Sequence, residues 1–173
     1  MIFRSFVTRD SAILRRAYVT YVRPLVEYCT PVWYPVSAHD IRLIENVQRK
    51  YTKRIPALKN CSYEERLQKL SLETLELRRL RFDLHMVYKI VNELVDLPLD
   101  QFFAWPTYLD TRGASVKLFK PRCITSARSN YFSVRIINCW NSLSDDVLMA
   151  SSLASFKYKL SKVDLTRFLS GYV

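Results

Sequence analysis

Glycine is almost absent from this chain, and its absence constrains the fold more than any other feature. The 173 residues include only Gly113 and Gly171. Turn-rich β-sandwiches and glycine-rich phosphate loops rely on residues that adopt positive φ angles, so the composition disfavours both. Apolar residues form 49% of the sequence and recur at helical spacing, which indicates a packed core rather than disorder. The sequence therefore predicts a mainly α fold.

The N-terminal half contains clear signals for the starts and stops of helices. A helix should begin at Ser11, directly after Asp10, and Pro24 should kink or interrupt it because proline lacks a backbone N–H. Ser37 and Asp40 have the spacing of a capping box, with Asp in place of the usual Glu, before a helix of about 15–18 residues. The apolar face of that helix is predicted to contain Ile41, Ile44, Val47, Tyr51 and Ile55.

The strongest helical pattern lies between Thr74 and Leu94. Before it, Ser62 followed by Glu65 predicts the N-cap of a short helix that ends near Leu70. The longer helix has an apolar stripe that we expect to be core rather than a groove for a partner. The stripe consists of Leu77, Leu80, Leu84, Val87, Val91 and Leu94.

Beyond Pro98 the helical pattern is shorter and less regular. Residues 115–119 alternate weakly between polar and apolar side chains, which predicts a short strand. A short helix is predicted from Tyr131 to Trp140, and a last helix from about Ser152 to Val163. The inward-facing residues of this last helix should be Leu153, Phe156 and Leu160.

Positive charge is in excess and is concentrated towards the C-terminus. The formal net charge is +11, and residues 101–173 carry ten basic and four acidic side chains. Residues 111–144 carry six basic and no acidic side chains. Because cations bind phosphates and rings stack on bases, this stretch favours RNA or DNA as the partner over an anionic membrane. The aromatic residues among its cations are Phe119, Tyr131, Phe132 and Trp140.

Two groups of basic residues are candidates for nucleic-acid binding. The first lies on the outward face of the helix predicted after Ser37, where a solvated charged face is an equally good explanation. It comprises Arg42, Arg49, Lys50 and Lys53. The second lies in the acid-free stretch. It comprises Arg112, Lys117, Lys120, Arg122, Arg128 and Arg135.

No pattern for catalysis or metal binding stands out. The four cysteines form no C-x-x-C pair and the chain has two histidines, so a zinc site is not expected. Asp145 and Asp146 follow Ser144 and are interpreted as the acidic first turn of a capped helix, not as metal-binding carboxylates. We expect no cofactor, no small-molecule substrate and no membrane span. Buried free thiols would suit an intracellular protein, in the nucleus or the cytoplasm.

Four stretches together resemble one family. They are YVRPLVEYCTPVWYP (21–35), IRLIENVQRKYTKRIPALKNCSYEERLQKLSLETLELRRLRFDLHMVYKIVNELVDL (41–97), TRGASVKLFKPRC (111–123) and FSVRIINCWNSLSDDV (132–147). In these strings the chain is similar to the C-terminal part of the reverse transcriptase of a non-LTR retrotransposon, a LINE of the jockey type. The resemblance extends over nearly the whole chain, from about residue 3 to residue 163.

The resemblance implies a fold and partners. In such polymerases the segment after the palm contains the helical thumb, which grips the template–primer duplex. Residues 1–97 would then form a helical thumb-like region, 98–110 a connector, and 111–173 a smaller basic region that is α+β or irregular. The implied partners are RNA or an RNA–DNA hybrid, together with the palm and fingers domains of the polymerase.

The resemblance also implies that this chain has no polymerase activity alone. The family's aromatic-x-Asp-Asp hairpin has no counterpart, and Ser144-Asp145-Asp146 does not match its context. The chain is therefore expected to be a non-catalytic fragment, and Mg²⁺ would belong to the missing palm. An alternative is a decayed or domesticated fragment that acts as a protein-interaction module or has no function. Peripheral membrane binding is a weaker hypothesis, because no helix combines a broad apolar face with a lysine-rich polar face.

Overall fold

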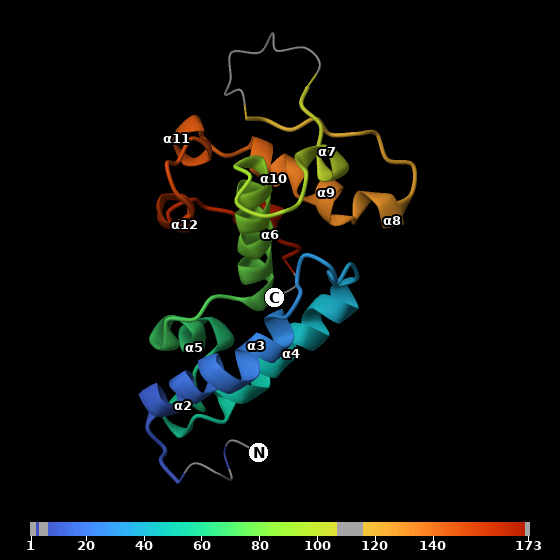
Figure 1. Ribbon diagram of the computed structural model, residues 1–173. Helices are drawn as coiled ribbons and strands as arrows, with labels where there is room; N and C mark the ends of the chain where they lie inside the picture. Colours follow the sequence, from blue (N-terminus) through green and yellow to red (C-terminus); the bar gives the residue numbers. More distant parts are fainter. Residues whose placement is uncertain (1–2, 4–6, 107–115, 172–173) are drawn as a thin grey trace. The chain divides into compact units, whose positions relative to one another are not determined.

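The computed structural model describes residues 3, 7–106 and 116–171. Within these residues the protein is mainly helical, as predicted, and no strand forms (Figure 1). The chain divides into two compact units. The first comprises residues 1–30, 35–78 and 170–173, and the second comprises residues 31–34 and 79–169. The division between Arg78 and Arg79 falls inside a helix, whereas the sequence analysis drew its regions at residues 97 and 110.

The first unit begins with three helical segments that follow one another without a break. They are α2 (Ser11–Ala17), the π-helix η1 (Tyr18–Val22) and α3 (Arg23–Glu27). Asp10 caps α2 by accepting a hydrogen bond from the N–H of Ile13 at 2.9 Å. Pro24 lies in the first turn of α3, directly after the wider turn of η1, so the predicted interruption takes the form of a change in helical register.

The remaining helices of the first unit are α4 (Ala38–Lys53), the 3-10 helix η2 (Pro56–Leu58), α5 (Tyr63–Leu70) and the first turn of α6 (Leu75–Val91). Of these, α4 and α5 start at the predicted caps. The hydroxyl of Ser37 accepts from the N–H of Asp40, and Ser62 with Glu65 forms a complete capping box. These local signals are confirmed. α2 and α4 lie side by side (Figure 1), where the hydroxyl of Tyr51 donates to the carbonyl of Leu14 at 2.9 Å.

Two helices end on residues other than glycine in the left-handed conformation. Ser71 has φ 48° after α5, and Glu93 has φ 55° after α6. In each case the next N–H donates to the carbonyl five residues earlier, at 2.9 Å after Ser71 and 2.8 Å after Glu93. This Schellman arrangement normally places glycine at the left-handed position. The chain therefore forms the Schellman motif without glycine, and Ser71 and Glu93 take the strained left-handed conformation.

The core of the first unit combines apolar side chains with a buried polar network. Glu45 and Gln48 of α4 are 1% and 0% exposed. The hydroxyl of Tyr18 donates to Gln48 Oε1 at 2.8 Å, the hydroxyl of Tyr63 donates to Glu45, and the N–H of Leu75 donates to Glu45 Oε2 at 2.8 Å. The pKa of the Tyr18 and Tyr63 hydroxyls is raised mainly by burial and secondarily by the Glu45 carboxylate. Both hydroxyls therefore stay protonated and can donate.

The buried face of α4 is therefore only partly the predicted one. Ile41, Tyr51 and Ile55 are buried as expected, but Val47 is 38% exposed. Three polar residues of α4 are buried on this face instead. Their hydrogen bonds are satisfied inside the unit, which removes most of the free-energy cost of burying them. These residues are Glu45, Gln48 and Thr52.

The second unit contains the rest of α6 and a series of short helices. They are α7 (Leu99–Phe102), α8 (Ser126–Ser129), α9 (Phe132–Arg135), α10 (Ile137–Asn141), α11 (Asp145–Leu148), α12 (Leu153–Ser161) and the 3-10 helix η3 (Thr166–Phe168). The single helix predicted from Tyr131 to Trp140 is two helices, broken at Ile136. Ser144 precedes α11 as predicted, but its side chain makes no capping hydrogen bond.

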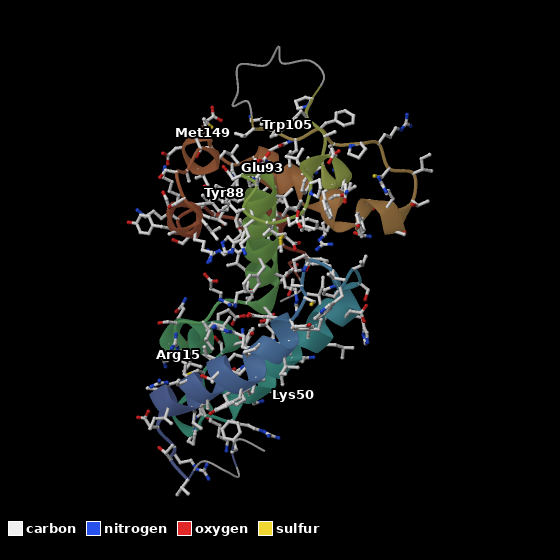
Figure 2. All side chains as sticks on the ribbon, in the orientation of Figure 1. Arg15, Lys50, Tyr88, Glu93, Trp105 and Met149 are labelled. Carbon is white, nitrogen blue, oxygen red and sulfur yellow. The ribbon has the colours of Figure 1, made fainter. Side chains whose placement is uncertain are left out.

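An aromatic core holds the second unit together. The ring of Tyr88 on α6, labelled in Figure 2, stacks on Phe156 of α12 with centroids 4.4 Å apart, and the ring of Trp140 lies 5.9 Å from that of Phe156. Leu84 is fully buried, as the predicted stripe requires. Leu94 was predicted to belong to that stripe, but it is 55% exposed because α6 ends at Val91 and the chain turns before it. None of the helices in the described ranges is long and apolar enough to cross a membrane.

Candidate nucleic-acid interface

The segment from residue 116 to residue 119 forms no strand, and side chains of α10 hold its backbone. The indole N–H of Trp140 donates to the carbonyl of Val116 at 2.9 Å. The amide of Asn141 accepts from the N–H of Leu118 at 2.9 Å and donates to its carbonyl at 2.8 Å. The strand predicted at residues 115–119 is therefore absent over the described part, because side chains of α10 take the place of a strand partner.

This anchoring determines which side chains of the basic stretch face solvent. Leu118 is 2% exposed and fixes the segment in the core, whereas Phe119 is 50% exposed. The N–H of Phe119 donates to the carbonyl of Ala104 at 2.8 Å, which ties the segment to the chain after α7. Lys120 and Arg122 follow immediately and are exposed. The buried Leu118 thus fixes the segment, and the ring of Phe119 and the cations Lys120 and Arg122 lie at the surface.

The helix α8 presents Arg128 in its last turn. The hydroxyl of Thr125 caps the helix by accepting from the N–H of Arg128 at 3.3 Å. At the other end, the amide of Asn130 donates to the carbonyl of Ser126 at 2.8 Å. The guanidinium of Arg128 itself is exposed and pairs with no acid among the described residues. Hydrogen bonds thus hold the backbone around Arg128, while its guanidinium faces solvent.

A cleft of about 420 Å³ lies beside these cations. Four rings line it: Phe102 from α7, Phe103 directly after α7, Phe119 from the anchored segment, and Tyr131 from the residue before α9. Arg128 lies in the same wall. Asp100 is the one acid among the lining residues. The cleft therefore combines flat apolar faces with a cation, which is the pair of features that a nucleotide requires.

The predicted cations of the second unit are not equivalent. Lys120, Arg122 and Arg128 are exposed, and no described acid lies within ion-pair distance of them. Lys117 is half-buried, also without a described ion pair. Arg112 lies outside the described residues. The first three are therefore the best candidates for contact with phosphate.

Arg135 has an internal partner and belongs to the scaffold of the second unit. Its Nη2 lies 2.9 Å from Asp83 Oδ2, and Asp83 is 1% exposed. The guanidinium also donates to the carbonyls of Asn130 and Pro31 and lies 4.4 Å above the ring of Tyr34. Burial raises the pKa of Asp83 to about 6, although Arg135 acts to lower it. The charge of Arg135 is thus largely used within the protein.

The four predicted cations of the first unit lie on α4, as expected. Arg42, Lys50 and Lys53 are exposed, and Lys50 is seen on the outer side of α4 in Figure 2. Arg49 is half-buried, and its guanidinium lies 4.2 Å from the centre of the Tyr63 ring. This cation–π contact is a structural role that the charge pattern alone did not reveal.

Lys50 also lines a groove of about 570 Å³ in the first unit. The groove is lined mainly by apolar side chains. Tyr21 and Leu25 are 60% and 77% exposed there, and Val47 is 38% exposed. Arg54 joins Lys50 as the second cation of the groove. Its other lining residues are three rings, Phe3, Tyr21 and Tyr51, and three aliphatic side chains, Val22, Leu25 and Val47. Of the side chains that are well exposed there, two are aliphatic and one, Tyr21, is a ring.

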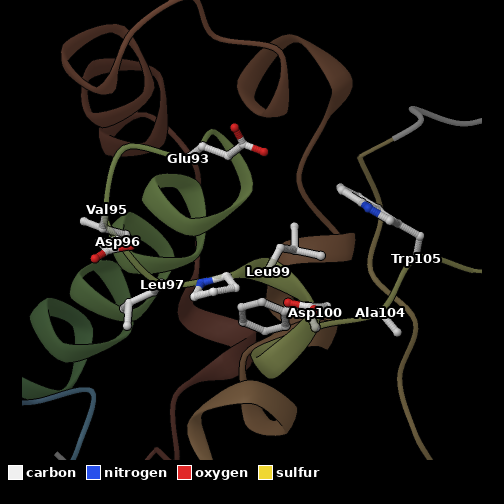
Figure 3. A pocket seen from close by; sticks show the side chains of 10 residues that line it. Glu93, Val95, Asp96, Leu97, Leu99, Asp100, Ala104 and Trp105 are labelled. Carbon is white, nitrogen blue, oxygen red and sulfur yellow. The ribbon is translucent and has the colours of Figure 1, made fainter.

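A third groove, in the second unit, is acidic and was not predicted from the sequence. It has a volume of about 620 Å³ and is lined by Glu93, Asp96, Asp100 and Trp105, among others (Figure 3). No lysine or arginine lines it. Its carboxylates would repel phosphate, and one of them, Asp100, also lines the cleft beside Arg128.

The acids and thiols of the described residues offer little chemistry. Asp146 pairs with Lys159 at 2.6 Å, and no three His, Cys, Asp or Glu side chains gather as metal ligands within the described ranges. Burial raises the pKa of the Cys139 thiol to about 12, which makes it unreactive. The expectation of buried thiols holds for Cys139 but is wrong for Cys29, which is exposed.

Comparisons of the chain with protein-family models, with curated proteins and with solved structures found no match.

Proposed function

We propose that this chain is a non-catalytic, C-terminal part of the reverse transcriptase of a non-LTR retrotransposon, and that it holds RNA or an RNA–DNA hybrid through its basic side chains. The observation that carries the binding proposal is the group of Lys120, Arg122 and Arg128, exposed and without acidic partners among the described residues. The four sequence stretches that resemble this family supply the assignment to a polymerase.

The chemistry of the group suits a sugar–phosphate backbone. Three cations within nine residues of chain, with no acid in residues 116–144, create a field that attracts polyanions. Binding of such cations to phosphates releases condensed counterions, which makes the affinity strongly dependent on salt. Phosphate contacts carry no information on base sequence, so the proposal specifies neither a sequence nor a preference for RNA over DNA.

The proposal assigns no reaction to this chain. In the parent polymerase, Mg²⁺ and its carboxylate ligands would belong to the palm domain. Asp145 and Asp146 lie in the first turn of α11, where Asp146 is already paired with Lys159. Their place at a positive helix end accounts for them without a catalytic role.

A protein-interaction module is the second candidate, and one observation favours it. The groove of the first unit exposes Tyr21, Leu25 and Val47 together, and clustered apolar side chains on a surface commonly mark a contact with another protein. In a complete polymerase, the palm or fingers would be the natural partner for such a surface. This role is compatible with nucleic-acid binding by the second unit.

The test is the salt dependence of binding by the full chain. A labelled RNA–DNA hybrid and a labelled single-stranded RNA are titrated at about 50 and 200 mM salt. If about six phosphates are contacted, the affinity should fall by about three orders of magnitude over that range. A binding curve that does not change with salt would contradict the proposal. Self-association of the chain without nucleic acid, measured by sedimentation, would support the interaction module instead.

A further inference from the structure

The cleft of the second unit is lined by aromatic rings, which phosphate binding alone does not require. Phe119 and Tyr131 are 50% and 54% exposed, so about half of each residue is open to solvent beside the cleft. Phe103 also lines the cleft and is 4% exposed, with its ring centre 5.8 Å from that of Phe132. The lining therefore combines two exposed rings with a ring that belongs to the core.

Hydrogen bonds hold the backbone that carries these two rings. Phe119 lies one residue after Leu118, whose N–H and carbonyl are both bonded to Asn141. Tyr131 is the N-cap residue of α9, and its carbonyl accepts from the N–H groups of Val134 and Arg135 at 2.9 and 3.0 Å. A preorganised wall loses less freedom when a ligand binds, which favours affinity.

The lining selects for a ligand with a flat face and a negative charge. A purely apolar ligand would gain nothing from Arg128, and a simple anion would gain nothing from Phe102, Phe119 and Tyr131. A nucleotide within a strand has both features at a fixed separation. The volume of about 420 Å³ lies in the range of roughly 300–1,000 Å³ that is usual for sites that take small molecules.

We infer that this cleft takes one unpaired base of a single-stranded segment, stacked against Phe119 and Tyr131, while the adjoining phosphates contact Arg128 and the exposed Lys120 and Arg122. The inference rests on the proposed function and adds to it a class of substrate. A base inside a duplex is stacked on both faces and cannot enter the cleft. The chain therefore prefers a strand with an unpaired base over a blunt duplex of equal charge.

The probes are two RNA strands of equal length and equal charge. One is abasic at every position, and the other carries a single 2-aminopurine base at its centre. The full chain should bind the strand with the base about 5- to 150-fold more tightly, because one stacked base contributes about that factor. The fluorescence of 2-aminopurine should fall on binding, since stacking on a ring quenches it.

Paired variants locate the effect. Replacing both rings by leucine, as Phe119→Leu with Tyr131→Leu, should abolish the gain from the base and the quenching while leaving the salt-dependent binding of the abasic strand. The matched control is Tyr158→Leu, which removes another exposed ring of the second unit that does not line the cleft. It should leave all three measurements unchanged.

The outcomes separate this inference from the proposed function. Equal affinity of the parent for the two strands, without quenching, overturns the stacking cleft but leaves phosphate binding intact. Failure of either strand to bind in a salt-dependent manner overturns the proposed function as well. The comparison of the two strands uses the unmodified chain, so it decides the matter even if the double variant does not fold.

Discussion

The two units each place cations beside a groove, but the neighbours of those cations differ. In the first unit, Lys50 and Arg54 border a groove whose walls include Leu25 and Val47. In the second unit, Arg128 shares a cleft with four aromatic rings, of which Phe119 and Tyr131 are well exposed. Leu25 and Val47 are two of the three well-exposed apolar side chains of the first groove, beside Tyr21, and aliphatic side chains offer a nucleic acid no face on which to stack. Such a surface suits a protein partner better. The exposed side chains around the cations thus lead to different expected partners.

The contrast extends to single arginines of the acid-free stretch. Arg135 is paired with the buried Asp83, and Arg128 is exposed without an acidic partner among the described residues. We expect Arg135→Gln to lower the free energy of unfolding by about 3–5 kcal/mol, because it leaves a buried carboxylate without its counter-charge. Arg128→Gln is the matched control and should change stability by less than about 0.5 kcal/mol.

Chemical denaturation of the two variants measures this difference, and the same samples serve for RNA titration. Arg128→Gln should weaken binding, whereas Arg135→Gln should not, provided that the variant is still folded at the temperature used. Equal stability of the two variants would mean that Arg135 is not part of the scaffold.

Charge reversal compares the two basic regions directly. We expect the triple variant Lys120→Glu, Arg122→Glu and Arg128→Glu to bind RNA about 100- to 1,000-fold more weakly, because three phosphate contacts become repulsions. The control reverses three cations of α4: Arg42→Glu, Lys50→Glu and Lys53→Glu. Both variants change the net charge by the same amount, and the control should lose about tenfold or less. Fluorescence anisotropy at constant salt gives both affinities.

If the α4 variant loses more RNA affinity than the variant of Lys120, Arg122 and Arg128, the main phosphate-binding surface lies on the first unit. Equal losses would mean that only the total charge matters. Both results are incompatible with a binding surface localised at Lys120, Arg122 and Arg128.

The buried pair of Arg135 with Asp83 should also produce a dependence of stability on pH. The folded-state pKa of Asp83 is raised to about 6 from 3.8, so the folded protein holds this proton more tightly than the unfolded chain does. The stability from this proton is fully present below about pH 3.8 and is lost as the pH rises through about 6. Relative to the parent, Asp83→Asn should therefore gain up to about 3 kcal/mol between pH 4 and pH 7.

The measurement is the difference in unfolding free energy between Asp83→Asn and the parent at several pH values. Taking this difference cancels the contribution of the other carboxylates. A difference that is constant with pH would show that Asp83 ionises in the folded protein as it does in the unfolded chain.

The smallest expected effects come from the strained helix ends, one in each unit. Ser71→Gly and Glu93→Gly remove a side chain from a left-handed position, which relieves about 1–2 kcal/mol of strain and adds about 0.5–1 kcal/mol of backbone entropy loss. We expect each variant to be more stable by roughly 0.5–1 kcal/mol. The transitions are compared by thermal and chemical unfolding. A loss of stability at either position would indicate that the original side chain makes a stabilising contact.

The features predicted correctly from the sequence are those with local causes. Asp10, Ser37 and Ser62 each cap a helix through a hydrogen bond to a residue three positions later, so the signal lies within one turn. The apolar stripe of α6 was equally visible, because Leu80, Leu84 and Val87 pack at helical spacing. The mainly α fold follows from such signals together with the scarcity of glycine.

The features that were missed depend on partners far away in the chain. Gln48 is buried because it bonds Tyr18, thirty residues earlier, and no pattern within α4 contains that information. The counter-charge of Arg135 lies 52 residues before it. The strand expected at residues 115–119 has the alternation of a strand, but whether a strand forms depends on its neighbour. Here that neighbour is Asn141, a side chain of α10.

In the candidate interface too, the local features were predictable from the sequence and the long-range ones were not. The acid-free stretch and the rings of Phe119 and Tyr131 were visible in the sequence. The contribution of Phe102 and Asp100 to the same cleft was not, because α7 is brought to these residues by the fold. The acidic groove beside Trp105 was missed for the same reason.

The most direct test of the account is to map where bound RNA touches the protein. The full chain is mixed with single-stranded RNA that contains 4-thiouridine, irradiated and digested, and the crosslinked peptides are identified by mass spectrometry. The account predicts crosslinks in the peptides that contain Phe119 and Tyr131, and their loss in the triple variant of Lys120, Arg122 and Arg128. Crosslinks confined to α4, or none above the level of an unrelated basic protein, would contradict it.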